Sequence, residues 1–94
     1  MAYFALIYHV VDDYVVRRAS LRAEHLALAT KAHQRGELVM GGAFADPVDK
    51  ALLIFRGSDK SVVETFAKND PYVLNGLVKH WEVRAWTVVI GNVD

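Results

Sequence analysis

The chain has 94 residues, of which 53% are hydrophobic and 23% are charged, a balance typical of a globular chain with one domain over residues 1–94. Eleven Lys and Arg side chains balance eleven Asp and Glu side chains, which argues against nucleic acid as a partner. The absence of cysteine excludes disulfides, thiol nucleophiles and cysteine-based metal sites. The apolar N-terminal run stops at His9, far short of the ~20 residues that span a membrane, so we expect a cytoplasmic protein without a membrane partner.

The first half of the chain predicts a strand, a helix and a second strand. Residues 2–10 are aromatic and β-branched and predict the first strand. Between Tyr14 and Arg35 there is no Gly or Pro and good helix formers dominate. We therefore expect one helix of about six turns that ends at Gly36. Residues 37–45 predict the second strand.

The second half predicts a hairpin partner, a shorter helix and a last strand. In chain order, the expected segments are a connector over 46–50, a strand over 51–56, a helix from Ser58 or Asp59 to about Lys68, an irregular segment over 72–78 and a strand over 80–90. This order, with right-handed crossovers, predicts an α+β ferredoxin-like βαββαβ fold. Its four-stranded antiparallel sheet carries two helices on one face.

Both faces of the predicted sheet are apolar. In the first strand, Tyr3, Ala5 and Ile7 alternate with Phe4, Leu6 and Tyr8. An antiparallel sheet with one solvated face alternates apolar with polar residues, and the two helices cover only one face here. We therefore expect a homodimer packed through the helix-free face, with higher oligomers also open, and a cleft between sheet and helices.

The usual cofactor and metal motifs do not occur in the sequence. No two histidines stand three or four residues apart, the spacing at which two side chains of a helix share a metal ion. No Gly-rich phosphate loop precedes a predicted helix, and no Ser lies in a Gly-x-Ser-x-Gly turn. We therefore expect neither a metal nor another cofactor.

A polar stripe on the first predicted helix is the strongest chemical signal. Arg18, Arg22 and His25 follow at i, i+4 and i+7 and project from one side of the helix. One interpretation is a solvated face with an incidental imidazole. The other is an anion-binding site beside a base.

Asp70 is the acid best placed to meet His25. His25 lies roughly 16 Å along the first helix and Asp70 roughly 15 Å along the second, at 1.5 Å per residue, so helices side by side would bring them level. A carboxylate beside an imidazole sets its tautomer, as a general base or proton shuttle requires. The alternative is that Asp70 only forms a cap or turn before Pro71.

Taken together, these residues resemble the YciI-like (YCII-related) family over nearly the whole chain. The resemblance rests on Arg22-x-x-His25-Leu26, His33-x-x-Gly36-x-Leu38, Gly41-Gly42, Asn69-Asp70-Pro71-Tyr72 and His80-x-x-Val83. It implies similarity in fold to muconolactone isomerase, within the dimeric α+β barrel superfamily. It also implies that His25 and Asp70 are a catalytic pair in an interfacial cleft, with Arg22 as a neighbour that binds substrate.

The chain departs from the family pattern at two points, which leave the substrate open. Asn69 stands where the family commonly has Ala, and the strand end is Gly-Gly-Ala-Phe rather than Gly-Pro. Tyr72 either donates its hydroxyl to a ligand or packs behind the helix end, and Tyr8 and His9 are expected to line the same cleft.

Several other polar and aromatic residues have assignments of their own. We expect His33 to serve the last carbonyls of its helix. Arg84 is expected to form an ion pair between protomers or to contact an anion. We assign His80, Trp81 and Trp86 to the interface or the core.

Three functions follow from the sequence. The first is a cofactor-independent enzyme that uses His25 and Asp70 for proton transfer on a small organic acid or lactone, as muconolactone isomerases and related dehalogenases do. The second is a non-catalytic small-molecule-binding or accessory module that acts as a dimer. The third follows the haem-degrading enzymes and cofactorless oxygenases of the superfamily, with Trp81 and Trp86 around an oxidising pocket.

Overall fold

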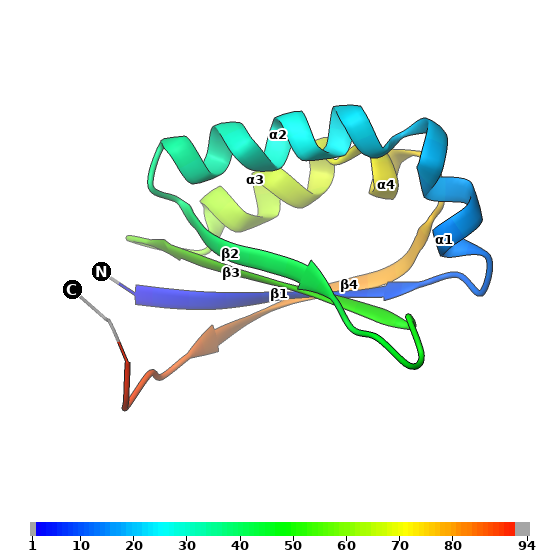
Figure 1. The fold of residues 1–94 in the computed structure, drawn as a ribbon. Coiled ribbons are helices and arrows are strands. Elements are labelled where there is room, and N and C mark those ends of the chain that lie inside the picture. Colours follow the sequence, from blue (N-terminus) through cyan, green and yellow to red (C-terminus); the bar gives the residue numbers. More distant parts are fainter. Residues whose placement is uncertain (1, 92–94) are drawn as a thin grey trace.

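Four antiparallel strands form one sheet in the order β2-β3-β1-β4 in the computed structural model, which describes residues 2–91 (Figure 1). The strands are β1 (Ala2–Val10), β2 (Leu38–Ala43), β3 (Lys50–Gly57) and β4 (Val78–Trp86). β1 lies between β3 and β4, so the first strand of the chain is central in the sheet. This arrangement confirms the expected α+β fold.

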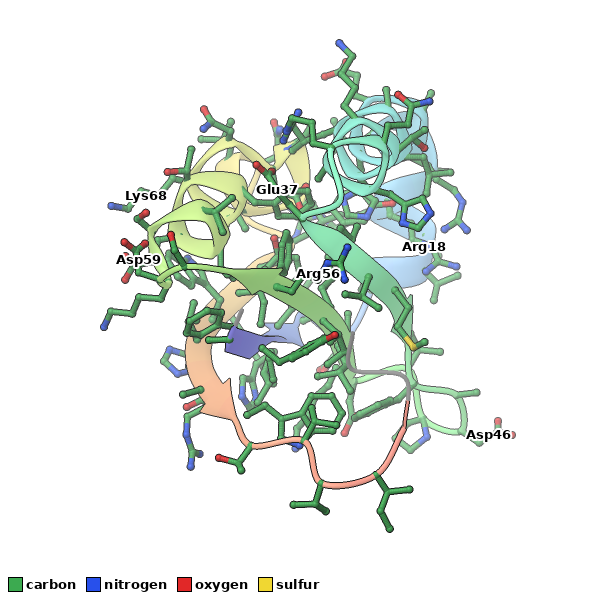
Figure 2. All side chains as sticks on the ribbon, turned by 90° about the vertical axis from the view of Figure 1, so that its left-hand side faces the viewer. Arg18, Glu37, Asp46, Arg56, Asp59 and Lys68 are labelled. Atoms are coloured by element: carbon green, nitrogen blue, oxygen red, sulfur yellow. The ribbon has the colours of Figure 1, made fainter. Side chains whose placement is uncertain are left out.

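The helices lie on one side of this sheet. They are α1 (Tyr14–Arg17), the 3₁₀ turn η1 (Arg18–Ser20), α2 (Arg22–Gln34), α3 (Ser61–Asn69) and α4 (Pro71–Leu74). α2 and α3 run side by side across the sheet (Figure 1), and the end-on view in Figure 2 shows both above it. Within residues 2–91 no helix covers the opposite face, which we call the open face; the other is the closed face.

The core fills the space between the sheet and α3. Alternate residues of β1 are buried, namely Phe4, Leu6, Tyr8 and Val10. α3 adds Val63, Phe66 and Ala67, whose i, i+3, i+4 spacing places them on one side of the helix. The apolar residues that recur every second position in the strand and about every 3.6 positions in the helix thus pack together in one layer.

The expected single helix from Tyr14 to Arg35 is wrong, because the chain breaks at Leu21 between η1 and α2. A continuous helix would run straight on, whereas the break lets the chain wrap the end of the sheet and bury Tyr14, which is 4% exposed. Tertiary packing decides this because helix propensity is a weak preference. The end of α2 is as expected, with Gly36 at φ +80° in the left-handed region after the last turn.

Other boundaries also differ from the sequence expectation; α3, for example, begins at Ser61 and β2 ends at Ala43. The segment over 72–78 is not wholly irregular, because Asp70 caps α4 and Pro71 occupies its first position. The last strand runs over Val78–Trp86 and not to residue 90. Trp86 pairs with Tyr3, next to the start of β1, so few residues remain there to pair with a longer strand.

Among the described residues, none of the helices combines the length and apolar character that crossing a bilayer demands.

Candidate active site

Asp70 stands at the junction of α3 and α4 on the closed face. Proline disfavours helical backbone in the residue before it, and Asp70 accordingly has φ −70° and ψ 123°, which ends α3. The chain turns there, and Asp70 Oδ1 accepts a hydrogen bond from the backbone N–H of Tyr72 at 2.9 Å. The sequence Asp-Pro-Tyr thus builds a cap that also holds the carboxylate in place.

This carboxylate has two further partners from distant parts of the chain. His25 Nδ1 of α2 lies 2.9 Å from Asp70 Oδ1, and the Tyr8 hydroxyl of β1 donates to Asp70 Oδ2 at 2.8 Å. Asp70 is fully buried. Since an ionised carboxylate only accepts, Nδ1 of His25 carries a proton and Nε2 is the nitrogen left for other chemistry. Asp70 therefore caps α4, as one interpretation expected, and also contacts His25, so it is not a cap alone.

Burial of Tyr8 makes it a permanent donor to Asp70. The Tyr8 side chain is 1% exposed. Desolvation, followed by the charge of Asp70 and the hydrogen bond to it, raises the pKa of Tyr8 far above its usual value. The phenol therefore stays protonated and continues to donate to the carboxylate.

Aromatic rings hold the imidazole from one side. The ring of His25 stacks on Tyr72 with centroids 3.9 Å apart and an interplanar angle of 9°. Tyr72 in turn meets Tyr14 edge to face, with centroids 5.6 Å apart. The plane of the imidazole is thus set by Tyr72 and its rotation by Asp70.

A pocket of about 180 Å³ opens beside His25, between the helices and the sheet. Its polar lining includes Tyr8, Tyr72 and two arginines, Arg18 and Arg22. The apolar lining consists of Leu26, Ala29, Leu38, Ala43, Ala51 and Leu53. This volume suits a ligand of one small ring.

Glycine forms part of the pocket wall at the end of β2. Gly41 and Gly42 both line the pocket. A Cβ added at Gly41 would lie 3.2 Å from Cγ of Leu53 in the neighbouring strand, a tight contact. The missing side chain at Gly41 therefore spares this wall a crowded contact with Leu53.

Two guanidinium groups give the pocket its positive charge. Arg22 is the first residue of α2, and Arg18 lies over the ring of Tyr14, with Cζ 5.1 Å from the ring centroid. The Tyr72 hydroxyl is buried and has no partner at hydrogen-bond geometry in the described part of the chain. Burial raises the pKa of Tyr72, and the charges of Arg22 and Arg18 oppose that rise.

Five of the residues that the sequence selected for the site meet here, whereas His9, also expected in the cleft, does not line the pocket. His25, Asp70, Arg22, Tyr72 and Tyr8 either line the pocket or, in the case of Asp70, support His25 from behind. Tyr14 and Gly41 are among the lining residues that were not selected. Their place depends on the helix break and on the register of β2 with β3, and neither leaves a signal in local sequence.

Other candidates lie elsewhere. His9 does not line the pocket, because it alternates with Tyr8 and so faces away from the helices. His33 Nδ1 lies 2.7 Å from the carbonyl oxygen of Leu38, which starts β2, so it joins helix to strand and does not cap its own helix. Trp81 packs against the core, whereas Trp86 is 49% exposed.

Comparison with known proteins yields one family match. The model of the YCII-related domain matches residues 1–87 of the chain. No curated protein sequence matches it.

Solved structures share the fold. The chain of 5-chloro-2-hydroxyhydroquinone dehydrochlorinase (TftG) from Burkholderia phenoliruptrix, solved in complex with 2,5-dihydroxybenzoquinone, is 20% identical, with a TM-score of 0.75 over 90% of this chain and 93% of that one. A protein from Agrobacterium tumefaciens is 17% identical, with a TM-score of 0.60 over 95% and 94%. One from Mycobacterium tuberculosis is 14% identical, with a TM-score of 0.55 over 98% of both chains. At these identities the likeness establishes the fold.

Proposed function

The chain belongs to the YCII-related domain family, and on that premise we propose that it is an enzyme that moves a proton on a small organic anion without a cofactor. The observation that carries the proposal is the contact of 2.9 Å between His25 Nδ1 and the fully buried Asp70. A buried acid that sets the tautomer of a pocket imidazole is the arrangement that general acid–base catalysis needs.

Each pocket residue has a role in the proposed reaction. Nε2 of His25 takes a proton from a carbon next to a carbonyl group, and the ring cation is stabilised by Asp70. Arg22 and Arg18 bind the anion and the negative charge that develops on oxygen. The electron pair of the broken C–H bond either receives the proton at another carbon, as in an isomerisation, or expels a chloride ion, as in a dehydrochlorination.

The size and charge of the pocket support a substrate of one ring with an acidic group. The cavity of about 180 Å³ is small, and its charged lining is cationic. The dehydrochlorinase of similar fold was solved with 2,5-dihydroxybenzoquinone, an acidic compound of this size. We therefore place small lactone carboxylates and hydroxylated quinones first among substrates.

Hydrogen exchange in heavy water tests the proton transfer without knowledge of the product. The protein is incubated in D₂O with a panel of small lactone carboxylates and hydroxyquinones, and loss of each C–H signal is followed by NMR. At least one compound should exchange faster with the protein than alone. His25→Ala should slow that exchange by about 10²–10⁴-fold with little change in melting temperature, because general base catalysis contributes on this scale.

His33→Ala is the matched control, since that imidazole lies outside the pocket. It should exchange the compound at the rate of the unaltered protein. Exchange that survives His25→Ala contradicts the proposed base. Binding of a panel compound that Arg22→Ala weakens, without exchange by any variant, favours the second function, a binding or accessory module.

We also propose that a second copy of the chain covers the open face. Four apolar residues of β1 and β3 that share this face and are half-buried in the single chain support this: Tyr3, Ala5, Ile7 and Leu52. Met40, paired with Ile54, is 67% exposed in the single chain, and Trp86, paired with Tyr3, is 49% exposed. Covering such a patch is the usual reason for self-association.

A further inference from the structure

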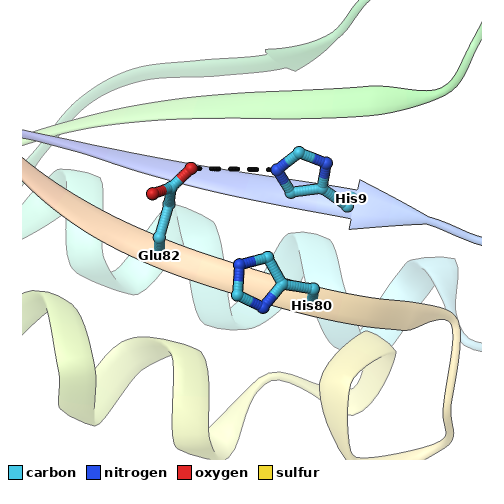
Figure 3. Close-up of side chains that lie close together, drawn as sticks. All are labelled: His9, His80 and Glu82. Atoms are coloured by element: carbon cyan, nitrogen blue, oxygen red, sulfur yellow. Dashed lines mark ion pairs between the residues drawn. The ribbon is translucent and has the colours of Figure 1, made fainter.

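Three side chains with metal-binding groups converge on the open face, away from the proposed catalytic pocket. They are His9 at the end of β1 and His80 and Glu82 on β4 (Figure 3). One ligand atom from each lies within 4.8 Å of the others. None of these three residues lines the pocket beside His25, so the cluster is a separate feature.

The register of the two strands explains the convergence. His80 and Glu82 are two residues apart in a strand and therefore point to the same face. β1 pairs with β4 so that His9 lies opposite His80 and Ile7 opposite Glu82. The pairing then shifts between His9 and Val10, and such irregularities often redirect side chains next to sites.

The distances are those of a site that closes with small side-chain movements. Nε2 of His9 lies 3.8 Å from Oε1 of Glu82, and the rings of His9 and His80 have centroids 5.3 Å apart. In a tetrahedral site with bonds of about 2.0–2.1 Å, two ligand atoms lie about 3.3 Å apart. Side-chain rotations that move the ligand atoms by about an ångström therefore let all three groups bind one ion.

The donor set indicates the class of metal. Two imidazoles and one carboxylate suit a borderline divalent transition metal such as Zn²⁺, whereas Ca²⁺ and Mg²⁺ prefer oxygen ligands only. Three protein ligands leave a fourth position for water or another ligand. Lys50 lies opposite His9 on β3, and its positive charge would repel a cation. The carboxylate of Glu82 offsets this repulsion by neutralising part of the metal charge.

We propose that His9, His80 and Glu82 bind one Zn²⁺-class ion per chain on the open face. The sequence predicted no metal because no two histidines have the helical spacing of three or four residues. A strand places i and i+2 together, and the third ligand comes from a strand about 70 residues earlier in the sequence.

Calorimetric titration with Zn²⁺ tests this site. The full chain, freed of metal with a chelator, should bind one ion per chain. His80→Ala should abolish this saturable binding. Glu82→Gln should weaken it by more than about tenfold, since loss of even outer-shell partners costs about 10–100-fold in metal affinity. His33→Ala should bind like the unaltered chain.

Paramagnetic Co²⁺ locates the ion independently of affinity. In NMR spectra of the imidazole groups, Co²⁺ should broaden the signals of His9 and His80 first and leave those of His25 and His33 sharp. Failure of the unaltered chain to bind Zn²⁺ saturably overturns the proposal. Binding that His80→Ala leaves intact, or first broadening at His25, overturns it equally. Melting of each variant in chelator shows that the fold is retained.

Discussion

The two faces of one sheet each bring histidine and a carboxylate together, and the two arrangements differ in burial. On the closed face, Asp70 is 0% exposed and has partners from three segments, namely Tyr8, His25 and the backbone of Tyr72. On the open face, the side chain of Glu82 is 41% exposed and its ion pair with His9 has a distance of 3.8 Å. An imidazole and a carboxylate are thus held rigidly on the closed face and loosely on the open face.

This difference separates two kinds of chemistry. A fully buried acid that accepts hydrogen bonds on both oxygens holds an imidazole in one tautomer and one orientation, which suits repeated proton transfer. Ligands that are partly exposed and loosely paired can move onto an ion at little cost, because exposed ion pairs contribute little to stability. Both proposals for this protein therefore rest on burial more than on residue identity.

Removal of the two acids should give the largest contrast. Asp70→Ala leaves the Tyr8 hydroxyl, the Tyr72 N–H and His25 without their acceptor, so we expect a loss of about 3–5 kcal/mol in the free energy of unfolding. Glu82→Ala should cost less than about 1 kcal/mol, because it breaks only an exposed pair. Urea unfolding of both variants measures this. Equal losses would show that burial does not distinguish the two faces.

Truncation of neighbouring apolar residues in β1 compares the faces without charge. Leu6 is fully buried on the closed face, and Leu6→Ala should cost about 2–5 kcal/mol. Ile7 is half-buried on the open face, so Ile7→Ala should cost less than about 1.5 kcal/mol in the single chain.

Protein concentration sharpens this second test. If a second copy covers the open face, the melting temperature of the unaltered chain rises with its concentration. Ile7→Ala should weaken that rise. A melting temperature independent of concentration, with a chain that sediments as a monomer, would contradict the proposed homodimer.

Alkaline pH offers the smallest and most specific test of the closed face. Burial raises the pKa of Tyr8 in the folded state, whereas the unfolded phenol ionises near its ordinary value of about 10. The folded state therefore binds more protons above that pH, and the stability contributed by Tyr8 is present below pH about 10 and is lost as pH rises. The expected slope from this group is about 1.4 kcal/mol per pH unit.

Tyr8→Phe should remove that part of the alkaline slope. The slope that remains should come from Tyr72, whose pKa is also raised by burial. Denaturant unfolding between pH 9 and about 11 measures both slopes. An unchanged slope in Tyr8→Phe would mean that Tyr8 ionises in the folded protein and is no fixed donor to Asp70.

Much of the fold was predictable from sequence, because local patterns carry it. The period of two in β1 and Gly36 after a long run without glycine indicated the element order. The pairing of His25 with Asp70 was proposed from similar distances along two helices, but the break at Leu21 puts His25 in the first turn of α2, and Asp70 lies just after the end of α3. The two side chains do meet at 2.9 Å, although not for the reason that the sequence offered. Pro71 also predicted where α3 ends, since its effect on Asp70 is a local steric one.

Only the tertiary structure decided the rest. The break at Leu21, the stacking of His25 on Tyr72 and the edge contact of Tyr14 arise from packing between segments. His9 does not lie in the expected cleft, because side chains alternate along β1 and that of His9 points to the open face. There the register of β1 with β4 places it opposite His80, about 70 residues later in the sequence. Sequence by itself determined which backbone forms were favourable, since those depend on near neighbours. Which side chains meet depended on register and on the helix break, which are settled by the packing of the whole chain.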